Sequence, residues 1–305
     1  MDDTILVGSA SWTDKTLIAC GRFYPKEAKT AEARLRYYAS QFPMVEVDSS
    51  YYALPTAANA QLWVERTPPG FVFNIKAFRA FTGHAFDPAV LPRDMQIALG
   101  AGARRSMDLE DLPRELQDEL WRRYIEAIAP LKRAGKLGAV HFQFSPRVHD
   151  KAFVERCVER MQGHLLAAEF RHRRWFDGAA LEDTLAFERG LGLVHTIVDC
   201  PQGFATSVPC VWDVTNPQLA LVRLHGRNRA TWNITHAKSS SSRFDYWYSA
   251  AELDAMVPEI EHLATQAKHV HVVFNTNNED QGQVNARLMR QLLRKRYVQG
   301  LDSHA

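Results

Sequence analysis

Eight short apolar runs recur along the chain and alternate with longer amphipathic segments. The short runs are rich in β-branched and aromatic residues, which is typical of strands, whereas the longer segments carry apolar residues three or four positions apart, which is typical of helices. Strands that alternate with helices predict parallel strands joined by helical crossovers. The expected strands are residues 5–12, 44–52, 71–78, 137–144, 165–172, 193–200, 219–226 and 269–276.

The helical segments have recognisable starts as well as the helical period. Thr30 is a suitable N-cap, with Glu32 in the first turn that follows it, and Ser249 followed by Glu252 has the pattern of a capping box. The expected helices are near residues 30–41, 57–66, 113–134, 151–162, 178–190, 250–268 and 284–297.

Eight such units predict either a closed barrel or an open doubly wound sheet. An open dinucleotide-binding sheet usually has a glycine-rich turn after its first strand, but residues 9–13 read Ser-Ala-Ser-Trp-Thr, with no nucleotide-cofactor motif. We therefore expect one parallel eight-stranded (β/α)8 barrel of the TIM type, a single domain across residues 1–305. Two departures are expected: a long excursion after the third strand (79–136, with a loop at 100–105) and an irregular crossover after the sixth (201–217).

Composition narrows the class of protein further. The formal net charge of +2 gives no bulk attraction to nucleic acid or anionic membranes, although a local basic patch is compatible with it. The chain has no uninterrupted apolar run of about 18 residues, so we expect no membrane association. The start of the chain does not resemble a signal peptide, and its four cysteines are scattered without CxxC spacing. These features predict a cytoplasmic protein; the oligomeric state stays open.

Alternation along each strand sorts residues into a helix-facing set and a set that faces the barrel interior. The apolar set on strand two is Val45 and Val47, which leaves Glu46 and Asp48 for the interior. The same rule predicts an interior that is largely polar, where barrels usually have layers of Val, Ile and Leu. The other expected interior residues are Asn74, Lys76, His141, Gln143, Glu169, Arg171, His195, Asp199, Arg223, His225, His271 and Asn275.

Two interpretations explain so many charges inside a barrel. Buried charges cost several kcal/mol each unless they are paired. The acids and bases are close to balanced, so a salt-bridge network that only holds the barrel closed is one interpretation. The other is a functional site, because barrel enzymes place their sites at the C-terminal ends of the strands. The two interpretations are compatible if the deeper residues stabilise the barrel and the residues at the rim form the functional site.

The candidate roles follow from side-chain chemistry. For catalysis we select groups that transfer protons or act as nucleophiles: Glu46, Asp48, Lys76, Glu169, Asp199 and His225. For binding an anionic small molecule we select cationic, aromatic and amide side chains: Trp12, Tyr51, Tyr52, Gln143, Arg171, Trp175, Arg223, Arg227, Asn275 and Asn277. A divalent metal on the interior Glu, Asp and His residues is possible but has no clear motif, and the His269-Val270-His271 pattern at the opposite end is interpreted as structural.

Several motifs in the chain resemble those of the YecE-like family, also called domain of unknown function 72. They extend over about residues 5–290, and what the resemblance implies is a barrel fold without a settled activity. Many members have an aromatic residue after the asparagines of strand eight, whereas this chain has Asn278-Glu279-Asp280. The motifs are Gly8 to Trp12 with Phe23-Tyr24-Pro25, Val45 to Tyr52 with Leu54-Pro55, Phe71 to His84 (with Lys76, Arg79 and Thr82), Gly138 to Pro146, Glu169-Phe170-Arg171 with Trp175, Val222 to Arg227, Tyr246 to Ser249, and Phe274 to Asn277 with Asn285-Ala286.

Function is therefore left with three alternatives. The first is a cytoplasmic barrel enzyme of the hydrolase, lyase or isomerase class that binds a carboxylate- or phosphate-bearing small molecule at the C-terminal mouth. The second is a metal-dependent, nucleic-acid-binding barrel of a nuclease type, which would use the basic clusters at 171–174, 225–229 and 104–105. The third is a non-catalytic binding or scaffold protein.

Overall fold

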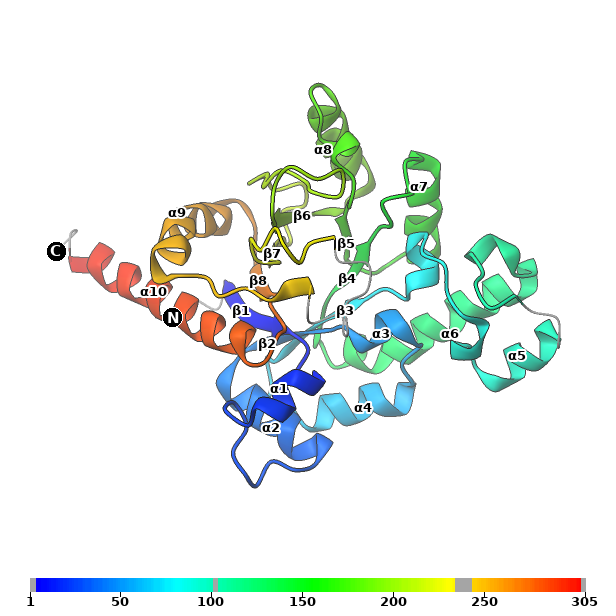
Figure 1. Ribbon diagram of the computed structural model, residues 1–305, viewed down its shortest axis with the longest axis horizontal. Coiled ribbons are helices and arrows are strands. Elements are labelled where there is room, and N and C mark those ends of the chain that lie inside the picture. The colour runs from blue at the N-terminus through cyan, green and yellow to red at the C-terminus, as the bar shows by residue number, and fades with distance from the viewer. Residues whose placement is uncertain (1–3, 101–103, 234–242, 303–305) are drawn as a thin grey trace.

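Eight parallel strands close into a barrel in which each strand pairs with the next and β8 pairs with β1. The computed structural model describes residues 4–100, 104–233 and 243–302, the last six of these by backbone alone. The helices surround the strands (Figure 1). The prediction of a TIM-type (β/α)8 barrel is confirmed. The strands are β1 (Ile5–Ala10), β2 (Met44–Val47), β3 (Val72–Lys76), β4 (Leu137–Gln143), β5 (Leu166–Glu169), β6 (Val194–Asp199), β7 (Ala220–Leu224) and β8 (Val270–Phe274).

The helices begin where the sequence placed their caps. The Thr30 hydroxyl accepts from the backbone N–H of Ala33, and Ser249 with Glu252 forms a complete capping box. All seven expected helices are present, together with three shorter ones, α1, α3 and α5. The helices are α1 (Lys15–Cys20), α2 (Ala31–Gln41), α3 (Ser49–Tyr52), α4 (Ala57–Glu65), α5 (Arg93–Leu99), α6 (Arg114–Arg133), α7 (Lys151–Arg160), α8 (Ala180–Leu191), α9 (Ala250–Gln266) and α10 (Gln281–Asp302). None of the helices within the described ranges is long and apolar enough to cross a bilayer.

The second strand is shorter than predicted. It ends at Val47, and Ser49–Tyr52 forms the short helix α3. The Ser50 hydroxyl donates to the carbonyls of Val47 and Lys76, which turns the chain over the end of β3. Tyr51 and Tyr52 therefore lie on a helix above the barrel and not on a strand.

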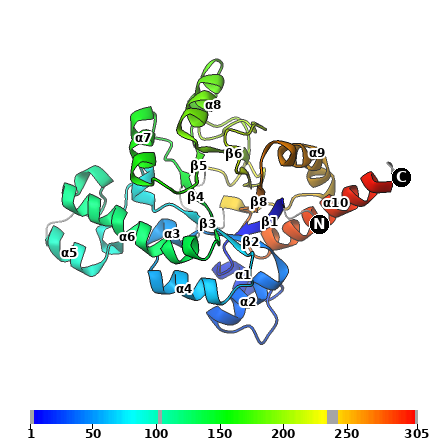
Figure 2. The ribbon, with the colours of Figure 1, turned by 180° about the vertical axis from the view of Figure 1, so that it is seen from behind.

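Both expected irregular crossovers are present, but residues 101–103 of the loop expected at 100–105 lie outside the described residues. The excursion after β3 places α5 beyond α6, at the outer margin of the molecule in both views (Figures 1 and 2), and a single bridge between Phe86 and Met107 closes its base. Between β6 and β7, residues 200–219 are described throughout and form no helix.

Apolar side chains pack in two layers, one between strands and helices and one inside the barrel. The inner layer corrects the prediction of a largely polar interior, because it fills the space toward the N-terminal ends of the strands and confines the charged residues to the other half. The polar residues that alternation predicts for the interior lie near the C-terminal strand ends, and small or apolar residues precede them on the same face of the strands. The inner layer comprises Ala10, Met44, Ala139, Ala167, Val194, Leu219, Leu221 and Val273, with Leu6, Val72 and Leu165 packed against it.

The assignment of β6 to the interior by alternation was wrong. Val194 packs in the inner layer, whereas Ile197 belongs to the outer core. His195 faces the helices, where its Nδ1 lies 2.9 Å from a carboxylate oxygen of Glu188 on α8. Asp199 shares this outward parity, so neither His195 nor Asp199 faces the lumen.

Gly8 tests how closely β1 and β2 approach each other. A Cβ atom at Gly8 would lie 2.3 Å from the carbonyl oxygen of Met44 on β2. We expect Gly8→Ala to lower the free energy of unfolding by about 1–3 kcal/mol, because the two backbones would have to separate. The matched control is Gly190→Ala on α8, where no atom lies within 4 Å of the new methyl group. It should stabilise the helix by about 0.5–1 kcal/mol. Urea denaturation measures both, and equal stabilities for the two variants would contradict the close approach.

Candidate functional site

Arg223 on β7 is fully buried and joins two carboxylates across the barrel. Its Nε and Nη2 donate to the two oxygens of Glu46 at 3.0 and 2.6 Å, and its Nη1 donates to Oε2 of Glu169 at 2.5 Å. Glu46 lies on β2 and Glu169 on β5, and both carboxylates are fully buried. The planar guanidinium suits this fork because it donates two parallel hydrogen bonds to one carboxylate and another in a second direction.

Glu169 is the most highly connected acid of the site. Its Oε1 accepts from Nη1 of Arg171 at 2.8 Å and lies 3.1 Å from Nε2 of His225, while Nε2 of His141 lies 3.3 Å from Oε2. On the other side of the His225 ring, the amide of Asn275 lies 2.8 Å from Nδ1. An amide donor at Nδ1 requires the proton of His225 to sit on Nε2, where it is donated to Glu169.

Burial and charge act in opposite directions on these groups. Burial alone would raise the pKa of Glu169, but the positive charge of Arg223 and the contacts with His225 and His141 hold it well below 4.5. Burial lowers the pKa of His225 to about 3, although Glu169 opposes this effect. The deep network therefore contains an ionised Glu169 beside Arg223 and the neutral rings of His225 and His141.

A second ion pair lies nearer to the mouth. Nζ of Lys76, at the end of β3, lies 3.4 Å from Oδ1 of Asp48 and 4.9 Å from the centre of the Tyr51 ring. The guanidinium of Arg79 lies 5.4 Å from the same ring. Burial would raise the pKa of Asp48, but Lys76 and Arg223 lower it. Tyr51 therefore contacts two cations at the rim, where the sequence predicted a ligand-binding aromatic residue.

The segment after β7 folds over the mouth and contributes residues that sequence reasoning missed. The Arg171 guanidinium lies 4.8 Å from the centre of the Trp232 ring, and the Phe244 ring stacks on His225 at 5.4 Å. Arg243, which precedes Phe244 in the chain, is close enough to Arg171 for their charges to interact. Burial lowers its pKa first, and the positive charge of Arg171 lowers it further. These three residues lie in a stretch without helix or strand period, so only their basic and aromatic composition was available as a signal.

Asp199 belongs to a separate polar cluster outside the lumen. It accepts from Nε of Arg227 at both oxygens, each at 3.0 Å, and from the Tyr248 hydroxyl at 2.6 Å. The same hydroxyl accepts from the backbone N–H of Gly226. This cluster ties the end of β6 to the segment after β7, which places Asp199 and Arg227 in a supporting position and not with the other candidate catalytic groups.

The remaining candidate binding residues divide between the mouth and the outer core. Trp12 packs edge-on against Trp63 and Phe73, and Trp175 stacks on Phe170 at 4.0 Å, so both lie between strands and helices and form no wall of the mouth. Gln143 reaches Nη1 of Arg223 at 3.4 Å, and Tyr52 is 49% exposed. Among buried oxygens that find no partner within the described ranges are Oδ1 of Asn275 and Oδ1 of Asn277.

Within the part of the chain that the structure describes, no group of three or more His, Cys, Asp or Glu side chains has the arrangement to hold a metal ion. All four cysteines are free thiols. The carboxylates that sequence analysis considered as metal ligands, Glu46 and Glu169, instead point their oxygens at Arg223.

The molecule is thus a TIM-type barrel with a buried arginine–carboxylate network beneath a cationic, aromatic mouth. Comparison with known proteins agrees with this class. The sequence profile described as "Protein of unknown function DUF72" matches residues 6–304, and the chain belongs to this family.

Relatives with known sequences or structures share almost the whole chain. The UPF0759 protein YunF of Bacillus subtilis (strain 168) is 31% identical over 295 residues, which cover 95% of this chain and 94% of YunF. A crystal structure of a DUF72 family protein from Enterococcus faecalis V583 is similar with a TM-score of 0.75 at 26% identity, covering 95% of each chain. A DUF72 family protein from Thermotoga maritima MSB8 gives a TM-score of 0.73 at 24% identity, covering 95% of this chain and 99% of that one.

Removal of Arg223 should destabilise the fold strongly. Arg223→Met leaves Glu46 and Glu169 buried without their main counter-charge, and we expect a loss of about 3–5 kcal/mol in the free energy of unfolding. The matched control is Arg123→Met on α6, whose ion pairs with Asp94 and Glu119 lie at the surface. Its effect should stay below about 1 kcal/mol. Chemical denaturation compares the two, and a similar loss in both would contradict a stabilising role for the network.

Acid should weaken the fold before the carboxylates protonate. Burial, opposed in His225 by Glu169, lowers the pKa of His225 and of His271 to about 3, from 6.5. Below pH 6.5 the unfolded chain binds protons that the folded chain does not, so stability should fall as the pH falls from 6.5 toward 3. Each such histidine contributes a slope of up to about 1.4 kcal/mol per pH unit.

The slope is best measured between pH 6.5 and 4.5. Carboxylates such as Glu169, whose pKa is lowered from 4.5, remain ionised in both states over most of this window. His225→Gln should reduce the slope, whereas His262→Gln, at an exposed position of α9, should leave it unchanged. A wild-type free energy of unfolding that is constant across the window would show that the buried histidines are not held neutral.

Proposed function

We propose that this barrel binds a small molecule bearing a carboxylate or phosphate group at its C-terminal mouth. The observation that carries the proposal is an excess of positive charge at the rim above a balanced interior. In the interior, Glu46, Asp48 and Glu169 are paired with Arg223, Lys76 and Arg171. Arg79 and Arg243 add to this set, and an anionic ligand would offset their charge.

Arg79 is the strongest candidate for direct contact. It forms no ion pair with any described residue, and its Nε is buried without a hydrogen-bond partner among them. The residue is only half-buried, and its Nη groups make no hydrogen bond to a described residue, so they can donate to a carboxylate or phosphate oxygen of a ligand. Residues 234–242, which lie between Trp232 and Arg243 in the sequence, include one lysine and no acidic residue.

The pKa of His84 is lowered by burial and by several positively charged residues at this rim. Burial lowers its pKa to about 3, and the charges of Arg79, Lys76, Arg171 and Arg147 lower it further. A neutral imidazole held among cations indicates a strong local preference for negative charge. Because four separate cations act on one ring, a single anionic group placed near it would interact with several of them.

The rest of the mouth favours a ligand with a flat or ring-shaped body. Tyr51 stands beside Lys76, and Trp232 and Phe244 cover Arg171 and His225. Flat apolar faces next to cations bind rings that carry a carboxylate or phosphate better than they bind a bare ion.

If the barrel is an enzyme, we assign proton transfer to Asp48 and Lys76. Glu46 and Glu169 each accept hydrogen bonds from Arg223 and are fully buried, which leaves them inaccessible. Asp48 is in contact with Lys76, and its side chain is 18% exposed, which places this pair within reach of a molecule at the mouth.

A small anion fits the distribution of arginines better than nucleic acid does. Arg227 is paired with Asp199 and Glu252, Arg173 is paired with Asp177, and Arg229 donates to the backbone of Gln202. These internal pairs reduce the charge that the basic clusters offer to a phosphate backbone. The four free thiols, which are scattered along the sequence without CxxC spacing, support a cytoplasmic location for the protein and therefore a ligand from the cytoplasm.

Calorimetric titration with phosphate, benzoate and acetate in low-salt buffer tests the proposal. We expect benzoate to bind more tightly than acetate because of the aromatic walls. Arg79→Gln should weaken binding of phosphate and benzoate about tenfold or more, since a hydrogen bond to a charged group contributes about 1.5–3 kcal/mol. Asp48→Asn should strengthen it a few-fold, because a negative charge leaves the rim.

The control is Arg36→Gln on α2, which removes an exposed arginine paired with Glu32 and should leave binding unchanged. Opposite effects of the two rim variants on affinity would localise the anion to the mouth. Absence of heat with all three anions, or equal losses in Arg79→Gln and Arg36→Gln, would refute the proposal.

A further inference from the structure

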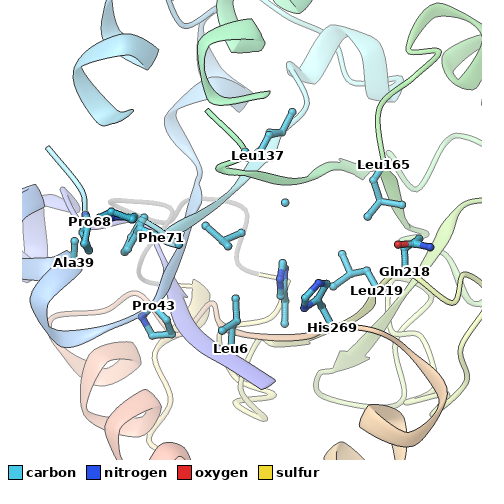
Figure 3. Close-up of a pocket in the computed structure, with 16 residues that line it drawn as sticks. Leu6, Ala39, Pro43, Pro68, Phe71, Leu137, Leu165, Gln218, Leu219 and His269 are labelled. Carbon is cyan, nitrogen blue, oxygen red and sulfur yellow. The ribbon is translucent and has the colours of Figure 1, made fainter. Parts of the chain in front are cut away.

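A cavity of about 640 Å³ opens at the end of the barrel opposite the mouth. Its walls are the first residues of several strands and the loops that precede them. Leu6, Leu137, Leu165 and Leu219 surround it (Figure 3). The inner apolar layer of the barrel is therefore only partly covered at this end, since Leu6, Val72 and Leu165 remain partly exposed.

Leucine, proline and phenylalanine side chains form much of the lining, which has no Lys, Arg, Asp or Glu side chain among the described residues. Proline and phenylalanine side chains from the loops before β2 and β3 form one side, and Gln218 and His269 lie on the other (Figure 3). A concave apolar surface of about 300–1,000 Å³ with a few convergent polar groups is the usual form of a small-molecule site. The polar group that decides which ligand fits is His271.

The proton position of His271 follows from its neighbours. The backbone N–H of Ala139 donates to Oδ1 of Asn74 at 3.0 Å, which establishes that this atom is the amide oxygen. Nδ1 of His271 lies 3.1 Å from the same oxygen and must therefore carry the proton. Nε2 is then left with a lone pair. It makes no hydrogen bond to any described residue, and His271 is one of the residues that line the cavity.

Gly138 makes this arrangement possible. A Cβ atom there would lie 2.4 Å from Oδ1 of Asn74 and 3.0 Å from Cε1 of His271. The missing side chain lets the imidazole and the amide meet, so the acceptor is held in one orientation at the edge of the cavity. His271 itself is 97% buried, since only 3% of its surface is exposed.

We infer that this cavity is a second binding site, for a neutral and largely apolar molecule that donates one hydroxyl or N–H group to Nε2 of His271. The apolar walls exclude charged ligands, because a charge would lose its hydration without gaining a partner. Burial lowers the pKa of His271 to about 3, so the ring stays neutral and remains an acceptor near pH 7. The site is independent of the anion site at the mouth and differs from it in ligand class.

Phenol and toluene are suitable probes, since they have similar size and only phenol donates a hydrogen bond. In protein with ¹⁵N-labelled histidine at pH 7, long-range ¹H–¹⁵N spectra should show His271 neutral with its proton on Nδ1. Phenol should shift the Nε2 resonance saturably and bind about tenfold more tightly than toluene, as one additional hydrogen bond of about 1.4 kcal/mol would produce. Saturating phosphate should leave this resonance unchanged.

Three variants locate the effect. Leu165→Trp should fill the cavity and abolish the phenol shift, and His271→Phe should reduce the preference for phenol over toluene to about one. His262→Gln, at an exposed position of α9 that is not part of the cavity lining, should change neither. Leu165→Trp and the wild-type comparison suffice where His271→Phe does not fold. No saturable shift, equal binding of phenol and toluene by the wild type, or a shift that persists in Leu165→Trp would overturn the inference.

Discussion

The contact of Arg223 with Glu46 and Glu169 is the constraint on which the upper half of the barrel depends. Three fully buried charges would be strongly unfavourable apart, and each is stabilised only because the other two occupy fixed positions. Glu46 on β2, Glu169 on β5 and Arg223 on β7 come from well-separated strands, so their pairing links distant parts of the barrel wall. The neutral histidines and Asn275 then complete the hydrogen bonding around Glu169.

Because the deep charged groups are paired with one another, the groups that a ligand can contact lie nearer to the mouth. The carboxylates nearest the centre have the strongest ionic partners, and Asp48, with Lys76 beside it, lies closer to solvent. Above them, the rim carries guanidinium groups and aromatic rings. A balanced interior beneath an unbalanced rim explains how one set of charged residues stabilises the fold and also supports the proposed binding of an anion at the mouth.

Much of this arrangement is visible in the sequence, and its exceptions have physical reasons. Alternation assigned Glu46, Lys76 and Arg223 correctly because apolar residues occupy every intervening position of their strands. It failed on β6, where both faces carry polar and apolar residues and His195 is satisfied by Glu188 from a different element. Trp12 and Trp175 were expected at the mouth because they follow strand ends, but their rings turn toward other aromatic residues in the outer core.

Trp232, Phe244 and Arg243 lie in a segment with no periodicity, so no local rule could bring them to the mouth. Their position depends on tertiary contacts. At Gly226 φ is +84°, a Cβ would lie 2.4 Å from Cβ of Tyr246, and the backbone N–H donates to Tyr248. That hydroxyl is in turn held by Asp199. The outward orientation of Asp199, which alternation missed, is therefore part of what brings the aromatic cover over the mouth.

The two ends of the barrel differ because the inner apolar layer separates them. Above it, carboxylates and guanidinium groups face one another and the rim gains a positive field; below it, the same lumen is lined by leucines and a neutral imidazole. His271 and His225 are both buried and both neutral, but His225 donates to a carboxylate while His271 donates to an amide and presents its lone pair to a cavity. The neighbour that accepts the proton decides which atom each histidine has left for a ligand, and so the same side chain completes an ionic network at one end and leaves an acceptor for a neutral molecule at the other.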